Sequence, residues 1–245
     1  MSGREASFTP DDPAMHAAAA AALDLIQDGA RVGLGSGRTS SVFVHLLGER
    51  VRAGLRVTAV PASGAIETLA RAEGIPLVPL TADDGLDITV DGADEVAPNL
   101  DLIKGHGGAL VRERIIASAS ARQVIMVGAE KLVRELGARF AVPVEVIPFA
   151  LGPATRAIRD AGLIPNARMN AECTHELVNE NGNLTLDCAL PAPLAGARAA
   201  RELEASLLAI AGVVDTGLFL GTAERVLVGH AEGRVSTLVR GKVPA

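Results

Sequence analysis

The amino-acid sequence predicts an α/β fold, with a mostly parallel, Rossmann-like sheet that carries helices on both faces and a smaller inserted α+β domain. Two patterns lead to this prediction. From residue 12 to about 140, apolar strand-like segments alternate with helical segments, which is typical of a parallel sheet covered on both faces. From 141 to 219 the order becomes strand, helix, strand, strand, helix, strand, which is the ferredoxin-like βαββαβ arrangement.

The first half of the chain opens with a helix predicted over residues 13–27. Asp12 can cap this helix, Pro13 suits its first turn, and Gly29 can end it. The elements predicted after it alternate in type: strand 31–35, a helix through Val42 and Leu47, strand 56–60, helix 65–73, a short strand near Leu77, strand 86–90, helix 109–120 and strand 123–127. In such sheets ligands bind beyond the carboxyl ends of the strands, so the loops at those ends are candidate sites.

The second half is predicted to contain strand 144–147, helix 153–160, strand 163–172, a turn at Asn181-Gly182, strand 183–188, helix 194–209 and strand 213–220. Strands 225–228 and 234–239 are expected to return to the first sheet. We therefore predict a main α/β domain over 12–140 and 220–245 and a small domain over 141–219. Residues 1–11 are polar and patternless, and we expect them to form a flexible lead-in.

Composition limits the classes of function. The formal net charge of −6 comes from interspersed acids and bases, which argues against a general nucleic-acid or anionic-membrane binder. No stretch approaches the ~18 apolar residues that a membrane span needs, and no leader pattern opens the chain, so we expect a cytoplasmic protein. Cys173 and Cys188 fit no Cys-x-x-Cys or zinc-ligand spacing, so we expect reduced thiols in the core.

A glycine-rich turn follows the first predicted strand. In Gly33-Leu-Gly35-Ser36-Gly37-Arg38-Thr39-Ser40, backbone N–H groups at a helix N-terminus favour a phosphate. Arg38 stands where a dinucleotide-binding fingerprint needs glycine, and no Gly-Lys-Ser/Thr is present at the P-loop spacing, so both of those interpretations fail. A turn with no ligand is the alternative for this segment.

Carboxylates cluster in Asp91-Gly92-Ala93-Asp94-Glu95, directly after the strand predicted over 86–90. The strand would deliver Asp91 and Asp94 to the carboxyl edge of the sheet. Solvated turn residues are the plainer interpretation of such a cluster. Metal binding is a further alternative, although no histidine lies nearby in sequence.

A third loop, Lys104-Gly105-His106-Gly107-Gly108, precedes the helix that contains Glu113. Glycines let the backbone approach a ligand, and the ammonium of Lys104 can polarise an oxygen atom. A fourth segment places Lys131 just after the strand predicted over 123–127, at the same sheet edge. Taken singly, Glu113 fits an ordinary charged helix face and Lys131 a solvated lysine.

In this order, the four segments resemble the A-type ribose-5-phosphate isomerases. The resemblance runs from about residue 20 to 239. Its most specific parts are Asp91 to Glu95, the Lys104-Gly-x-Gly-Gly-Ala-Leu-x-Arg-Glu113 segment, and Pro143-Val-Glu-Val-Ile-Pro148. The turn Asn181-Gly182-Asn183 also fits the family.

The resemblance implies an interconversion of ribose 5-phosphate and ribulose 5-phosphate through a cis-enediol, within the pentose phosphate pathway and without metal or organic cofactor. It places the general base on Glu113. The chemistry of such a reaction also needs a donor for the developing oxyanion, which Lys104 suits, and a group that assists ring opening, which could be Asp91 or Asp94. The positions implied to contact the sugar phosphate are Ser36, Gly37, Arg38, Thr39, Asp91, Gly92, Ala93, Asp94, Lys104, Gly105, His106, Gly107 and Lys131. A homodimer or homotetramer is the expected assembly.

Three positions depart from the family pattern. The usual lysine of the first helix aligns near Met15 and His16, neither of which is a permanent cation. Arg38 replaces the usual serine, and its guanidinium could supply the missing charge to phosphate. His106 replaces a glycine, which narrows the loop, so a related phosphorylated aldose is an alternative substrate.

Proteins of other classes share folds of this type. A sugar-phosphate-sensing regulatory module would need a DNA-binding segment, and residues 1–30 show no helix-turn-helix pattern. An amino-sugar phosphate deaminase would release ammonia. A coenzyme A transferase would use a glutamate as nucleophile and form a thioester that hydroxylamine traps.

Overall fold

The computed structural model describes residues 12–81 and 85–241, and its largest element is a six-stranded sheet in the order β13-β12-β6-β3-β1-β2. Its strands are β1 (Arg31–Leu34), β2 (Thr58–Pro61), β3 (Ile88–Gly92), β6 (Gln123–Gly128), β12 (Arg225–Gly229) and β13 (Val235–Val239). Neighbouring strands are parallel except β12 and β13, which pair antiparallel. The prediction of a mostly parallel sheet, completed by two returning strands, is confirmed.

Helices cover both faces of this sheet. Helices α1 (Pro13–Leu23), α2 (Arg38–Arg52) and α3 (Gly64–Ala72) share one apolar cluster with the strand residues Val90 and Met126. Helix α4 (Leu110–Ser118) lies on the opposite face, because Thr89, which alternates with Val90 along β3, donates a hydrogen bond to the carbonyl oxygen of Ile116 at 3.2 Å. The α1 helix begins as predicted, with the Asp12 side chain accepting from the N–H of Ala14 at 2.9 Å.

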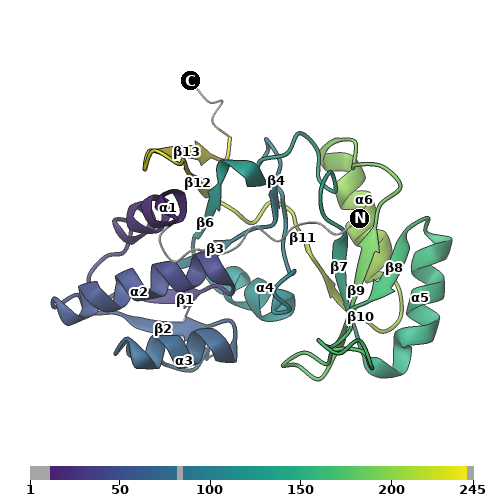
Figure 1. Cartoon of the computed structure of the whole chain (residues 1–245), viewed down its shortest axis with the longest axis horizontal. Coiled ribbons are helices and arrows are strands. Elements are labelled where there is room, and N and C mark those ends of the chain that lie inside the picture. The colour runs from purple at the N-terminus through teal and green to yellow at the C-terminus, as the bar shows by residue number, and fades with distance from the viewer. Residues whose placement is uncertain (1–11, 82–84, 242–245) are drawn as a thin grey trace.

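A second sheet of four antiparallel strands has the order β10-β7-β9-β8 and lies beside the first, on the right in Figure 1. It is formed by β7 (Val142–Val146), β8 (Ile164–Ala167), β9 (Leu184–Ala189) and β10 (Val213–Thr216), with helices α5 (Leu151–Asp160) and α6 (Gly196–Leu208). Ile158 of α5 and Leu207 of α6 pack in one cluster with Leu186 of β9, so both helices cover the same face. The predicted ferredoxin-like plan is confirmed, while the domain boundaries at 141 and 219 stay a prediction.

A small three-stranded sheet connects the two larger ones and was not predicted. It contains β4 (Glu95–Val96), β5 (Leu102–Ile103) and β11 (Leu218–Phe219). The strand predicted over 213–220 is divided at Gly217, whose N–H donates to Pro143 and whose carbonyl accepts from the N–H of Lys104. Strands of two residues carry no readable periodicity, which is why the sequence did not predict this sheet.

Other differences concern boundaries and one cysteine. The strand predicted over 163–172 ends at Ala167, because Asn170 Oδ1 accepts from the N–H of Thr174 at 2.9 Å and holds a turn. Cys173 lies in that turn and is exposed, so its assignment to the core was wrong, whereas Cys188 is buried. Two short 3-10 helices, η1 (Ala129–Lys131) and η2 (Pro148–Ala150), complete the elements.

Two expectations concern the ends of the chain and membranes. The lead-in predicted over 1–11 lies outside the described residues. Within 12–81 and 85–241, none of the helices combines the length and the apolar character needed to cross a bilayer.

The contact between α1 and β12 gives a stability prediction. A Cβ atom at Gly229 would lie 1.9 Å from the carbonyl oxygen of Ala14, whereas at Gly152, in α5, nothing lies within 4 Å of it. We expect Gly229→Ala to lower the free energy of unfolding by about 1–3 kcal/mol through overpacking. Gly152→Ala is the matched control and should leave stability unchanged or slightly raised. Equal stability of the two variants in urea unfolding would contradict this packing argument.

Candidate active site

The loops at the carboxyl edge of the six-stranded sheet meet around one pocket of about 370 Å³. Its lining residues are Met15, Ser36, Gly37, Arg38, Thr39, Gly92, Ala93, Asp94, Lys104, Gly105, His106, Gly107, Glu113 and Lys131. The structure therefore brings together the positions predicted from the sequence, and all of them except Asp91 line the pocket. Met15, which was noted only as a departure from the family pattern, also lines the pocket.

Asp91 lies behind the pocket wall, where it connects the glycine-rich turn to β3. It is fully buried, and its Oδ1 atom accepts from the N–H of Ser36 at 3.1 Å, from the hydroxyl of Ser40 at 3.2 Å and from the N–H of Gly92 at 2.8 Å. A Cβ atom at Gly35 would lie 2.0 Å from this carboxylate. Glycine at 35 is thus required by the close approach of Asp91.

Lys104 is the centre of the site. Its Nζ atom lies 2.8 Å from Asp91 Oδ2 and 3.0 Å from Glu113 Oε2, and it donates to the carbonyl oxygen of Gly92 at 2.6 Å. The side chains of Lys104, Asp91 and Glu113 are only 3%, 0% and 4% exposed. The contact with Gly92 is a hydrogen bond, whereas those with Asp91 Oδ2 and Glu113 Oε2 are ion pairs whose carboxylate oxygens have no hydrogen-bond donor within the described residues. Two carboxylates and one ammonium leave this buried cluster with an excess of negative charge.

Burial sets the ionisation of the cluster. Desolvation lowers the pKa of Lys104, but the attraction of Asp91 and then of Glu113 outweighs it, so the net pKa is raised and the ammonium stays charged at neutral pH. Burial raises the pKa of Glu113 to about 7, because the attraction of Lys104 only partly offsets desolvation and the repulsion from Asp91 and Asp94. Glu113 can therefore accept and return a proton near neutrality.

The pocket also contains the N-terminus of α2. Gly37 is the N-cap residue and brings no side chain to cap the helix, and Arg38 and Thr39 form the first turn. Arg38 and Lys131 supply cationic side chains to the same pocket. The N-terminal N–H groups of a helix of this length, beside two cations, form an environment that favours an anion.

The loop over residues 104–108 is held by Asp94 and by two groups that the sequence did not point to, the carbonyl oxygen of Ala141 and the side chain of Arg168. The N–H of His106 donates to Asp94 Oδ2 at 3.2 Å, and its Nε2 atom lies 3.2 Å from the carbonyl oxygen of Ala141. Arg168, just beyond β8, donates from Nη1 to the carbonyl oxygens of Gly105 and His106, each at 3.1 Å.

Glu180 makes a second connection from the segment of the four-stranded sheet. Both of its carboxylate oxygens accept from the N–H of Gly64, at 2.9 and 3.0 Å, at the start of α3. Its Oε2 atom also lies 2.8 Å from Nη1 of Arg112, the neighbour of Glu113 on α4. Neither Arg168 nor Glu180 stands out in the sequence, because the partners of each are far away along the chain.

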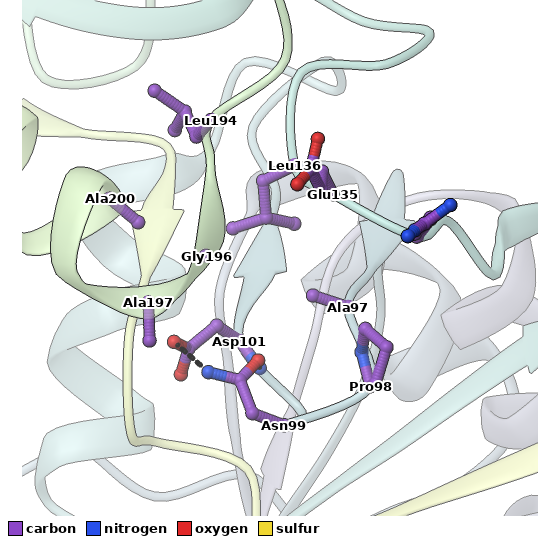
Figure 2. Close-up of a pocket in the computed structure, with 11 residues that line it drawn as sticks. Ala97, Pro98, Asn99, Asp101, Glu135, Leu136, Leu194, Gly196, Ala197 and Ala200 are labelled. Atoms are coloured by element: carbon purple, nitrogen blue, oxygen red, sulfur yellow. Dashed lines mark hydrogen bonds between the residues drawn. The ribbon is translucent and has the colours of Figure 1, made fainter.

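Other places in the structure offer less for catalysis. A separate hollow of about 280 Å³ lies where the turn between β4 and β5 faces the N-terminus of α6, and most of its lining is apolar (Figure 2). Its buried carboxylate, Asp101, already accepts from the N–H of Gly221 at 2.9 Å and from Asn99 Nδ2 at 2.6 Å. Within residues 12–81 and 85–241, no group of three or more His, Cys, Asp or Glu side chains is arranged to hold a metal ion.

Comparison with known proteins identifies the family. Residues 58–233 match the family described as Ribose 5-phosphate isomerase A (phosphoriboisomerase A). The chain belongs to this isomerase family. Its relatives include Ribose-5-phosphate isomerase A of Methylorubrum extorquens, 46% identical over 89% of this chain and 92% of that protein. Its counterpart in Gloeobacter violaceus is 45% identical over 93% of this chain and 96% of that protein.

Solved structures of family members have the same fold. The ribose 5-phosphate isomerase A of Methanocaldococcus jannaschii superposes with a TM-score of 0.86 at 36% identity, over 94% of this chain and all of that one. A D-ribose-5-phosphate isomerase in complex with phospho-erythronic acid gives a TM-score of 0.87 at 36% identity, over 92% of this chain and 97% of that one. The family resemblance stated from the sequence is therefore confirmed, and with it the fold class and the classification as an isomerase.

The ion cluster gives a second prediction. In Lys104→Met, Asp91 and Glu113 would face each other without a counter-ion, so we expect the free energy of unfolding at pH 8 to fall by about 3–5 kcal/mol. Loss of the ammonium raises the pKa of Glu113 further in the folded state, so this cost should shrink as the pH is lowered and Glu113 protonates.

Lys131→Met, which removes a partly exposed ammonium of the same pocket, should cost much less. Denaturant unfolding at several pH values measures both variants. A cost for Lys104→Met that does not change with pH would argue against charge as its origin.

Proposed function

We propose that the enzyme interconverts ribose 5-phosphate and ribulose 5-phosphate through a cis-enediol, with Glu113 as the general base. The observation that carries this proposal is the buried contact of 3.0 Å between Glu113 Oε2 and Lys104 Nζ on the wall of the pocket. A carboxylate that moves a proton and an ammonium that steadies an oxygen are the two groups that an aldose–ketose isomerisation needs.

Other groups that line the pocket suit the phosphate. The charge of Lys104 is already balanced by Asp91 and Glu113, so a phosphate would be neutralised by other groups. The N-terminus of α2, Arg38 and Lys131 supply them. A phosphate bound there would leave the first two carbons of the sugar near Glu113.

The proton transfer follows from these positions. Ionised Glu113 removes the proton from C2 of the open-chain aldose, and the electrons move to the carbonyl oxygen, where Lys104 stabilises the negative charge. The protonated carboxyl then returns a proton to C1, while the proton of the C2 hydroxyl passes to the C1 oxygen, which gives the ketose. The pKa of Glu113, raised to about 7 by burial, suits a group that must both accept and release a proton.

Ring opening is assigned to Asp94 rather than to Asp91. Asp91 is fully buried, and its carboxylate is occupied by Lys104 and three other donors. Asp94 lines the pocket, and one of its oxygens accepts only the N–H of His106 among the contacts of the described residues. We propose that Asp94 transfers the proton between the anomeric hydroxyl and the ring oxygen, while Asp91 positions Lys104.

The relative solved with phospho-erythronic acid supports the substrate class. That ligand joins a phosphate to a carboxylate, and a planar carboxylate resembles the enediolate that forms during isomerisation. A pocket that contains both an anion site and the ammonium of Lys104 would fit both features.

We further propose a cytoplasmic homodimer or homotetramer. Phe149, Ile164 and Val178 are 96%, 61% and 57% exposed in the segment of the four-stranded sheet, and exposed apolar side chains of this size support association. Sedimentation of the purified protein tests this proposal, since a monomer at micromolar concentration would contradict it.

A solvent-exchange assay tests the mechanism. We expect the purified enzyme, assayed with a chelator present, to convert ribulose 5-phosphate in D₂O into ribose 5-phosphate that carries deuterium at C2, because the enediol is protonated by a group that exchanges with solvent. Glu113→Gln should lower kcat by about 10²–10⁴-fold. A product without deuterium, together with full activity of Glu113→Gln, would indicate a direct hydride shift and would rule out the cis-enediol. Parallel assays with four- and six-carbon aldose phosphates test the substrate alternative raised by His106.

The ionisation of Glu113 predicts a pH dependence. The carboxylate is the active form, so kcat/KM should fall about tenfold per pH unit below an apparent pKa near 7. The Glu113 carboxyl holds its proton more tightly in the folded state than in the unfolded chain. Ionised Glu113 therefore lowers the free energy of unfolding above about pH 7, and this cost disappears as the pH falls. Glu113→Gln should therefore be no less stable than the wild type at pH 8. A flat profile of kcat/KM from about pH 6 to pH 8 would contradict this assignment.

A further inference from the structure

Glu95, the residue after Asp94, is a buried carboxylate whose role the mechanism leaves unassigned. It is fully buried and accepts three backbone N–H groups, those of Gly137 at 2.6 Å, Arg139 at 2.6 Å and Phe140 at 2.9 Å. Hydrogen bonds to a charged acceptor are short and strong, and three of them from one loop fix its backbone. Glu95 thus ties the loop over residues 137–140 to strand β4.

This loop touches the pocket residues Lys131 and His106. The Phe140 ring packs edge-on against His106, with ring centroids 4.8 Å apart, and Lys131 Nζ lies 5.0 Å from the centroid of the same ring. The guanidinium of Arg139 also donates to the carbonyl oxygen of Glu130, which precedes Lys131 in η1. The position of Lys131 therefore depends on the loop both through the Phe140 ring and through the backbone beside it.

The groups assigned to proton transfer between C2 and C1, Glu113 and Lys104, have separate supports. Lys104 is held by Asp91, Glu113 and Gly92, and Asp91 by the glycine-rich turn. None of these contacts runs through the loop over residues 137–140. Disturbing Glu95 should therefore displace Lys131 and leave Lys104 and Glu113 in place.

We infer that Glu95 is a positioning residue for substrate binding: through the loop over residues 137–140 and the Phe140 ring, it holds the Lys131 ammonium where the anionic group of the substrate binds. This inference rests on the proposed role of Lys131 in the pocket. In Glu95→Gln, the amide presents N–H groups toward the loop and can satisfy fewer of its donors. The loop and Phe140 then shift, and Lys131 loses its support.

The test is a double-mutant cycle with Glu95→Gln and Lys131→Met, read as KM for ribose 5-phosphate and kcat. We expect each single variant to raise KM by about ten- to hundredfold with kcat within about twofold, and the double variant to resemble Lys131→Met alone. A folded Glu95→Gln variant with the KM of the wild type would overturn the inference. The inference would also be overturned if the increases in KM of the two single variants multiplied in the double variant.

Two further variants separate positioning from stability. Phe140→Leu removes the ring but not the carboxylate and should raise KM in the same way; it replaces Glu95→Gln in the cycle if that variant does not fold. Asp101→Asn is the matched control, since Asp101 is another buried carboxylate that accepts a backbone N–H, that of Gly221, away from the pocket. It should lower the unfolding midpoint and leave KM unchanged. An equal rise of KM in Asp101→Asn would show a general loss of structure and overturn the inference.

Binding of inorganic phosphate distinguishes this inference from the proposed function. Calorimetric titration of the same variants measures phosphate affinity without any turnover. If the wild type binds phosphate but does not isomerise ribose 5-phosphate, the proposed function fails, and the cycle is read from phosphate affinity instead. Weaker phosphate binding in Lys131→Met but not in Glu95→Gln overturns the inference and leaves the proposed function standing.

Discussion

The structure of the site depends on one buried ammonium. Lys104 holds Asp91 and Glu113 within 3.0 Å of a single nitrogen atom in a place that water hardly reaches. Asp91 in turn binds the glycine-rich turn, so β1, β3 and α4 are joined through one charge. Burial of Glu113 raises its pKa into the range useful for proton transfer, and the same burial makes its ionised form costly to the stability of the fold. The burial that makes Glu113 useful for proton transfer is therefore also a source of instability.

Much of the fold could be predicted because its elements carry strong local patterns. The alternation of apolar strands with helices gave the parallel sheet, and the strand order β10-β7-β9-β8 fits the predicted ferredoxin-like plan. The three-stranded sheet was missed because β4, β5 and β11 are only two residues long each. The sequence predicts one continuous strand over 213–220, because the side-chain pattern does not show that the chain passes from one sheet to another at Gly217.

For the site, too, some features could be predicted from the sequence and others could not. The loops at the strand ends were found from glycines, charges and their order, and they do line one pocket. The separate positions of Asp91 and Asp94 could not be predicted, because both belong to one turn of the sequence and only burial distinguishes them. The supports of the loops were also missed. Glu95 meets its partners more than forty residues away, and Arg168 meets the carbonyls of Gly105 and His106 more than sixty residues away.

Every residue that lines the pocket lies before the four-stranded sheet begins at Val142. Two residues of that later segment nevertheless contact the loops and helices of the site. Arg168 donates to the carbonyl oxygens of Gly105 and His106, and Glu180 binds the starts of α3 and α4. A chain limited to the Rossmann-like part would keep all the reactive groups. It would lose the two residues that hold these loops and helices in position. The segment of the four-stranded sheet thus helps to position the reactive groups, although none of its residues lines the pocket.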